Sequence, residues 1–351
     1  MTADEHPTNE RATSARDIEF EVDGAVLRGS LELPSGSAGR APAVLLLGGT
    51  FSDLRDGDPD PRERPGVPVH KMYAHLARSL AARGIVSLRF DRRGCGQSTG
   101  ERGEGRAREI ADAAAAWDHL TRRPEVGGRL AMAGESAGAY VLCRLVAGGR
   151  TPDAAVLQGA LHRSIVGLLR FNIEQAQRYL DRGQAARSWV NRHAPHVGSD
   201  IERWHTIEHV LGPDEAYPDD AANDPAIADA LAGIAFELHE PPAEQFAVLR
   251  CPTLVIHGAN DMNVPVADAF ATVRSLWDAG NRDVELQILA GADHSLQLMP
   301  DDDEERIQER LTLRSFARPY HPRYPGAVVE YLARQLLLED AGLSRGPCGG
   351  G

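Results

Sequence analysis

The chain has few of the features that mark secreted, membrane-spanning or metal-binding proteins. No apolar run reaches the length of about 18 residues that a membrane-spanning helix needs. No two cysteines form a C-x-x-C pair, so neither a zinc site nor a redox pair is indicated. Scattered cysteines are typical of free thiols in a reducing compartment. The chain has four of them, Cys95, Cys143, Cys251 and Cys348.

Positive charge is also scarce. The 351 residues carry 38 basic and 51 acidic side chains, a net charge of −13, and Lys71 is the single lysine. A chain this acidic is not expected to bind nucleic acid or an anionic membrane surface. Its first 15 residues are polar and lack the apolar core of a signal peptide, so we expect a cytoplasmic protein. Residues 1–15 and 344–351 are expected to be disordered and flexible ends, and a homodimer is left open.

No metal or cofactor is predicted. His205 and His209 lie one helical turn apart, but no third ligand accompanies them. The acidic run at residues 301–305 is expected to form an exposed turn or to begin a helix, where negative charge favours the amino terminus.

The most informative pattern present is the G-x-S-x-G sequence at residues 134–138, which contains Ser136. Glycines allow the sharp strand-to-helix turn that exposes a nucleophilic serine. A strand-like apolar run at residues 129–133 precedes the pattern, and an apolar helical stretch at residues 139–146 follows it. The alternative is a glycine-rich turn with an incidental serine, and the other parts of a catalytic triad distinguish the two.

Two further residues follow in the order expected for such a triad. Residues 252–258 have the pattern of a buried parallel strand, and Asp261 lies in the loop after it. Residues 284–289 form a second predicted strand, and His294 lies in the loop after that one. Polar residues just after parallel strands meet at one edge of the sheet. Ser136, Asp261 and His294 are therefore the predicted nucleophile, orienting acid and general base.

Backbone amides for an oxyanion hole can be placed in the same way. Residues 43–47 are a predicted central strand, and a Gly-Gly-Thr-Phe loop follows them. In this arrangement that loop supplies one amide and the residue after the nucleophile, Ala137, supplies the other. Thr50 is the predicted loop donor, with Phe51 as the neighbour that could take its place. A helix at 69–83 and a strand at 85–90 are predicted next.

These segments together resemble the serine-dependent α/β-hydrolases, near the dienelactone-hydrolase-like esterases and the serine aminopeptidases. The resemblance rests on LLLGGTFSDLRDGD, LAARGIVSLRFDRRGCGQSTG, GESAG, IHGANDMNVP and AGADH, and it covers residues 17–160 and 251–338. It implies an α/β-hydrolase fold, in which helices flank a mostly parallel central sheet. We therefore expect a core at 16–160 and 249–343 and an inserted, mainly helical cap at 161–248.

The cap is where substrate choice is expected to lie, because caps exclude water and shape the pocket. Helices are predicted within it after residue 161 and near 185–191, 201–210 and 226–236. The alternative for each of its aromatic residues is that it packs the cap's own core. We expect at least two of the cap's aromatics to border the pocket. The cap candidates are Phe171, Tyr179, Trp189, Trp204 and Phe236, and Phe51 adds to them from the core.

The predicted chemistry is acyl transfer through Ser136, with a small-molecule acyl substrate as the partner. Hydrolysis of a carboxylic ester is the first expectation. The same triad could cleave a thioester, a lactone or an amino-terminal peptide bond, or could transfer or cyclise an acyl group in a biosynthetic pathway. A ligand receptor that keeps only the fold and the pocket is the alternative from a different class.

Overall fold

The computed structural model describes residues 13–35, 39–102, 106–211 and 242–337. Its sheet is built from β1 (Thr13–Val22), β2 (Ala25–Pro34), β3 (Ala41–Leu47), β4 (Val86–Phe90), β5 (Val126–Glu135), β6 (Ala154–Gln158), β7 (Thr253–Gly258) and β8 (Val284–Leu289). The helices are α1 (Met72–Ala82), α2 (Arg106–Thr121), α3 (Ala137–Ala147), α4 (Ile165–Leu180), α5 (Gln184–His193), α6 (His196–Leu211), α8 (Pro242–Ala247), α9 (Ala267–Asp278), α10 (Asp303–Thr312), a short 3-10 helix η3 (Arg314–Ala317) and α11 (Gly326–Leu336).

The sheet is mostly parallel, as expected. Its strand order is β1-β2-β4-β3-β5-β6-β7-β8. The β1–β2 and β2–β4 pairs are antiparallel, and every pair from β4 to β8 is parallel. The carboxyl ends of the parallel strands therefore lie along one edge, where the loops after them can gather side chains.

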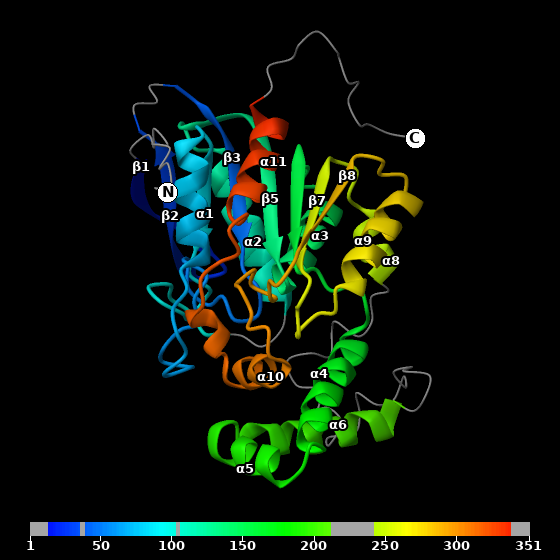
Figure 1. The fold of residues 1–351 in the computed structure, drawn as a ribbon. Helices are drawn as coiled ribbons and strands as arrows, with labels where there is room; N and C mark the ends of the chain where they lie inside the picture. The colour runs from blue at the N-terminus through cyan, green and yellow to red at the C-terminus, as the bar shows by residue number, and fades with distance from the viewer. Residues whose placement is uncertain (1–12, 36–38, 103–105, 212–241, 338–351) are drawn as a thin grey trace, which may run out of the picture.

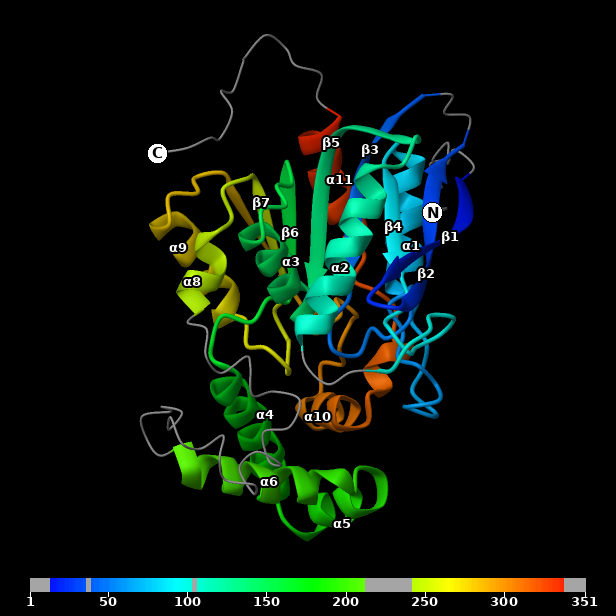
Figure 2. The same cartoon turned by 180° about the vertical axis from the view of Figure 1, so that it is seen from behind.

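Helices cover both faces of the sheet. Helices α1 and α11 lie on one face, and α2, α3, α8 and α9 lie on the other (Figures 1 and 2). Strand β3 shows why both faces need a cover: Val44 and Leu46 pack towards α1 and α11, while Leu45 and Leu47 pack towards α2 and α3. Side chains alternate between the faces of a strand, so a strand that is apolar at every position must be buried on both sides.

The amino-terminal prediction was partly wrong. Strand β1 begins at Thr13, inside the segment 1–15 that was expected to be disordered, because residues 13–22 pair with β2 along their whole length. Residues 1–12 and the predicted flexible tail at 344–351 lie outside the described residues.

The inserted segment is helical where it is described. Helices α4, α5 and α6 share a small apolar core with Ile307 and Leu311 of α10, and α10 lies beside α4, nearer to the sheet than α5 (Figure 1). The expected boundary at residue 248 needs correction, because Phe246 of α8 is fully buried in the core beside α3 and α9. The helix predicted near 226–236 lies outside the described residues.

Candidate active site

Ser136 occupies a strained turn between β5 and α3. Its backbone has φ 50° and ψ −117°, a conformation that L-residues adopt rarely and that clusters at functional sites. The flanking glycines are required by close approach: a Cβ on Gly134 would lie 2.5 Å from the carbonyl oxygen of Gly138, and one on Gly138 would lie 2.2 Å from that of Leu47. The G-x-S-x-G pattern therefore reflects tight packing around an exposed hydroxyl.

Asp261 and His294 come together after β7 and β8. Nδ1 of His294 lies 2.7 Å from Oδ2 of Asp261, and both residues are buried. The other carboxylate oxygen accepts hydrogen bonds from the backbone amides of Asn263 (2.7 Å) and Val264 (2.8 Å). Because the carboxylate is held by its own loop, it fixes the imidazole with Nδ1 towards Asp261 and Nε2 away from it.

A second histidine shares this carboxylate. Nε2 of His257 lies 3.1 Å from Oδ2 of Asp261 and 2.9 Å from the carbonyl oxygen of Val264. His257 is fully buried near the carboxyl end of β7, four residues before Asp261. It therefore provides the Asp261 carboxylate with a second donor from the strand itself.

Burial and charge shift the pKa values of this group strongly. Burial alone raises the pKa of Asp261, but attraction to His294 and hydrogen bonds from both histidines outweigh it and lower the pKa well below the usual range. Burial lowers the pKa of His294, but the Asp261 charge and hydrogen bond, with Glu135 and Asp293 adding to them, raise it to about 9. The buried Asp293 carboxyl has its pKa raised by burial to about 7.

Ser136 and His294 line the same cavity, which has a volume of about 400 Å³. Within the described part of the chain they do not yet share a hydrogen bond. In ligand-free enzymes such contacts are often long and tighten when substrate binds. The arrangement brings a hydroxyl in an exposed turn and an oriented imidazole to one cavity at the carboxyl edge of the sheet.

Both predicted oxyanion donors lie beside this cavity. Ala137 is the first residue of α3, and the first amides of a helix have no acceptor within the helix. Thr50 lines the cavity in the loop after β3. Phe51, the neighbour that could take its place, lines the cavity as well.

The loop that carries Thr50 is held from two sides. On one side the buried Glu135 carboxylate accepts hydrogen bonds from the Gly49 amide (2.9 Å) and the Ser52 hydroxyl (3.0 Å). On the other side, Arg92 donates to the carbonyl oxygens of Gly48, Gly49 and Thr50 at 3.3, 2.7 and 3.5 Å. The loop is thus held by Glu135 through an amide and a hydroxyl group, and by Arg92 through three carbonyl groups.

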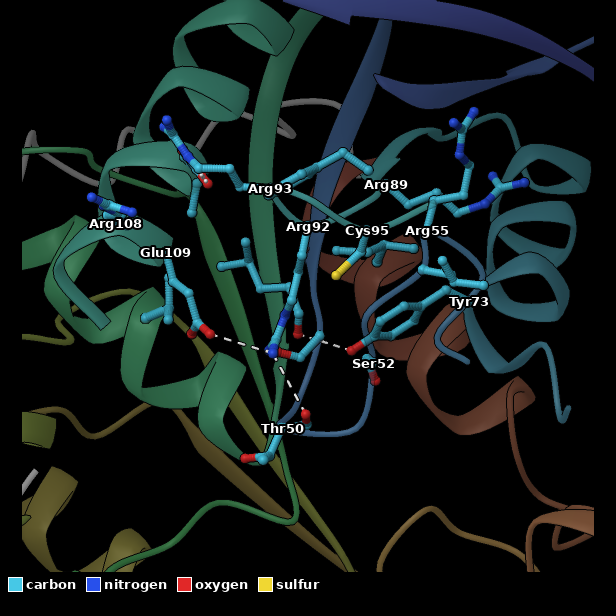
Figure 3. A pocket seen from close by; sticks show the side chains of 18 of the residues that line it. Thr50, Ser52, Arg55, Tyr73, Arg89, Arg92, Arg93, Cys95, Arg108 and Glu109 are labelled. Carbon is cyan, nitrogen blue, oxygen red and sulfur yellow. Dashed lines mark hydrogen bonds and ion pairs between the residues drawn. The ribbon is translucent and has the colours of Figure 1, made fainter. Parts of the chain in front are cut away.

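Figure 3 shows the Arg92 side of this support, in a second cavity of about 240 Å³ behind the loop. The guanidinium of Arg92 is paired there with Glu109 at 3.3 Å. Tyr73 donates its hydroxyl hydrogen to the carbonyl oxygen of Leu47 at 2.8 Å, which anchors the strand end just before the loop. Cys95 also lines this second cavity, where burial raises the pKa of its thiol to about 11, so it stays protonated and unreactive.

The aromatic pocket prediction was wrong for three residues. Phe51 and Trp204 line the active-site cavity, whereas Phe171, Tyr179 and Trp189 do not. Phe171 is covered by the Arg163 guanidinium, 5.4 Å from the ring centre. Trp189 packs against Tyr179 with ring centres 6.0 Å apart, inside the small core of α4 to α6. Phe236 lies outside the described residues, so Trp204 alone of the cap candidates that can be placed borders the cavity.

Most other residues of the cavity lining went unpredicted, and three of them come from different helices. Arg310 comes from α10, Phe316 from η3 and Asn172 from α4. Nothing in the sequence near Arg310 or Phe316 connects them with Ser136. A helical period would have put Asn172 on the same face as Leu168 and Leu169, which also line the cavity.

The described ranges contain neither a cluster of metal-ligating side chains nor a membrane-spanning helix. There, no three His, Cys, Asp or Glu side chains are grouped so that they could hold a metal ion. None of the helices in those ranges combines the length and the apolar character that crossing a lipid bilayer requires.

The chain is similar to known proteins in sequence and in fold. The family model described as serine aminopeptidase, S33 (Hydrolase_4), matches residues 69–301. An uncharacterized protein of Mycobacterium tuberculosis is 35% identical over 147 residues, 41% of this chain. The match spans 45% of that relative, less than half its length.

Solved structures show the same fold. An esterase of Pyrococcus furiosus superposes with a TM-score of 0.55 at 16% identity, covering 96% of each chain. An α/β hydrolase of Penicillium, GrgF, has a TM-score of 0.53 at 18% identity, covering 93% of this chain and all (100%) of that one. An acylaminoacyl peptidase of Pyrococcus horikoshii has a TM-score of 0.55 at 14% identity, covering 94% of this chain and 43% of that one. The fold is therefore that of the α/β-hydrolases.

Proposed function

Because the chain belongs to the serine aminopeptidase S33 family of α/β-hydrolases, we propose that it is a serine hydrolase that cleaves carboxylic esters. The observation that carries the proposal is the meeting of two independent features at one cavity. One is the strained backbone at Ser136, and the other is the buried Asp261–His294 pair at 2.7 Å. A strained backbone and the burial of charged groups each cost free energy. Their occurrence together at one cavity therefore supports a functional role.

The proposed reaction proceeds through an acyl-enzyme. Neutral His294 accepts the Ser136 proton at Nε2 as Oγ attacks the ester carbonyl carbon, and Asp261 stabilises the resulting imidazolium. The Thr50 and Ala137 amides donate to the oxyanion, each such donor being worth about 3 kcal/mol. Collapse of the tetrahedral intermediate breaks the carbon–oxygen bond, and His294 gives its proton to the departing alcohol. Water then attacks the acyl-enzyme in the same way, and the acid leaves.

The cavity lining favours an ester with an apolar body. Leu168, Leu169 and Ile173 from α4, with Ile207 from α6 and Phe316, form an apolar surface beside the Ser136 hydroxyl. Such a surface binds the acyl or alkyl part of a substrate by removing it from water. Thioesters, lactones and acyl transfer to an alcohol would use the same groups.

A second candidate is removal of an amino-terminal residue from a peptide. The observation in its favour is Asp200 of α6, a carboxylate in the cavity lining that could bind a free amino group. A carboxylate so placed would favour aminoacyl substrates, which carry a positive amino group, over substrates with an uncharged acyl group. The two candidates differ in the charge of the group next to the cleaved bond, which a substrate panel tests directly.

Labelling with a fluorophosphonate tests the proposal. The probe should modify wild-type protein at Ser136 and leave Ser136→Ala unlabelled, while Ser295→Ala removes another serine of the same cavity and should still be labelled. A panel of p-nitrophenyl esters, thioesters and aminoacyl anilides then ranks the reactions. Absence of labelling, or equal turnover by Ser136→Ala, would show that the chain is a ligand receptor or works by another mechanism.

A further inference from the structure

Arg310 of α10 is a half-buried cation in the lining of the active-site cavity. Its Nη2 donates to the side-chain oxygen of Asn172, and its Nε donates to the carbonyl oxygen of Met262 at 3.4 Å. Among the described residues no carboxylate lies within ion-pair distance of it. Among the described residues its Nη1 has no hydrogen-bond partner, and Arg310 lines the cavity.

Arg310 lacks a carboxylate partner although other arginines near it have one. Helix α10 and its surroundings are rich in acidic groups, but these are used elsewhere. Asp303 pairs with Arg306 at 3.0 Å, and Glu309 pairs with Arg318 at 2.7 Å. Arg310 therefore faces the cavity between two arginines that each have a carboxylate.

Nearby negative charges do not compensate Arg310 fully. Burial lowers its pKa, and the attraction of Asp261 and Asp200 opposes that shift only in part. The Asp261 carboxylate is already occupied by His294, His257 and two backbone amides. A guanidinium that has lost water without gaining a carboxylate gains most from an anionic ligand, because its planar donors match a carboxylate in two-point contact.

We propose that Arg310 binds the carboxylate of the substrate, so that the preferred substrates are esters with an apolar body and one carboxylate group. This inference rests on the proposed function and narrows its substrate class. The apolar residues of α4 and α6 contact the body of the molecule, and Arg310 contacts its charged end. The Asn172 and Met262 contacts hold the guanidinium in place before the ligand arrives, which reduces the entropy lost on binding.

Two pairs of esters test this preference, each pair matched in shape and different in charge. In the first pair the carboxylate is in the acyl chain: the mono-p-nitrophenyl ester of glutaric acid against p-nitrophenyl hexanoate. In the second it is on the alcohol: para-acetoxybenzoate against its methyl ester. Wild type should have a higher kcat/KM for the anionic member of at least one pair, and which pair responds identifies the side of the ester that meets Arg310.

The variant Arg310→Gln should lower kcat/KM for the anionic ester by roughly 10- to 100-fold, as expected for losing a hydrogen-bonded charge partner, and leave the neutral ester nearly unchanged. Arg310→Lys should lose less. Arg306→Gln is the matched control, since Arg306 lies one turn earlier on α10 with its own carboxylate. An equal loss for anionic and neutral esters would show that Arg310 only holds Asn172 and Met262 together, and the proposal would be wrong.

Binding measurements separate this proposal from the proposed function. In the Ser136→Ala background, calorimetry should give tighter binding of the anionic than of the neutral ester in the pair that responds, and adding Arg310→Gln should remove the difference. That result does not depend on hydrolysis. If the variant with Arg310→Gln fails to fold, glutarate should still compete with the anionic ester for binding to Ser136→Ala, and glutaramide should not. Equal competition by the two compounds, or by neither, would overturn the carboxylate site.

Discussion

Replacing Gly138 by alanine should damage the proposed oxyanion site, because it forces the start of α3 away from the end of β3. A Cβ at this position would lie 2.2 Å from the Leu47 carbonyl oxygen and 2.9 Å from that of Gly48. Real Cβ atoms essentially never come closer than 3.0 Å, so α3 and the end of β3 must separate by at least 0.8 Å. Leu47 leads into the Thr50 loop and Gly138 follows Ala137, so the displacement separates the two proposed oxyanion donors from each other.

The size of the effect follows from that separation. A misplacement of about 1 Å in a catalytic arrangement can cost on the order of 100-fold in rate. Forcing one extra methyl group into a packed site costs about 1–3 kcal/mol of stability. We therefore expect Gly138→Ala to lose about 100-fold in kcat with a smaller change in KM, because the oxyanion forms only in the transition state.

The assay is steady-state hydrolysis of a p-nitrophenyl ester, together with thermal unfolding of the same samples. Gly148→Ala is the matched control at the other end of α3: its backbone φ is −80°, and its Cβ would meet the Arg144 carbonyl oxygen at 3.3 Å. It should keep wild-type kcat. If Gly138→Ala lost stability but kept kcat within a few-fold of wild type, the oxyanion donors could not lie on either side of this contact.

Four further predictions concern the charges around the proposed triad and the Thr50 loop. Asp261→Asn should lower kcat by about 10⁴-fold, as expected when the imidazole loses its orienting carboxylate, in an assay of ester hydrolysis on folded protein. Because only neutral His294 can act as the base and its pKa is raised to about 9, kcat/KM should rise with pH up to that region, and Glu135→Gln should shift the rise to lower pH. The same raised pKa stabilises the fold below the ordinary histidine value near 6.5, and this stabilisation is lost as pH rises through about 9, which urea unfolding at several pH values measures. Arg92→Ala should lower kcat about tenfold or more with little change in KM, because a displaced Thr50 loop weakens binding of the transition state. Arg92→Lys should recover part of the lost kcat. Arg78 is exposed, and Arg78→Ala should leave kcat unchanged.

Much of the catalytic core could be predicted because its signals are local. The strand predicted at 85–90 is β4 (Val86–Phe90) in the structure, and the strands before Ser136, Asp261 and His294 were found within a few residues. Each strand is a short apolar run that ends at a turn, and each turn must carry its polar residue to the same edge of a parallel sheet. The order of these signals along the chain was therefore enough to group residues that lie far apart in sequence.

The antiparallel edge of the sheet was harder to predict. Strand β1 exposes much of one face, and its first residues are polar, so residues 13–15 resemble a disordered end. What orders them is pairing with β2, in which Thr13 lies opposite Pro34. Pairing between strands uses backbone groups that every residue type has, so the amino-acid composition of β1 does not reveal it.

The aromatic residues of the cap show a different difficulty. Tyr179 and Trp189 lie on helices whose periodicity was visible in the sequence, but periodicity does not say what a helical face meets. They pack together in the small apolar core that also takes in Ile307 and Leu311, residues more than a hundred positions later in the chain. Which aromatic residue faces the cavity is thus decided by the position of α10.

Arg310 brings these two lessons together. The acidic run before it was expected to form an exposed turn or to begin a helix, and it begins α10: Asp302 caps this helix by accepting a hydrogen bond from the Glu305 amide at 2.8 Å. That local signal sets the rotation of every later residue in the helix, and it places Arg310 two turns further on. Only the packing of α10 against α4, below the edge of the sheet, brings Arg310 to the cavity that Ser136 lines. The reacting groups of this chain are encoded next to the strands that carry them, whereas the group proposed to select the substrate reaches the cavity through contacts between distant helices. Relatives that keep G-x-S-x-G and the Asp and His loops but place another residue at position 310 should therefore share the chemistry and differ in the charge of the ester they prefer.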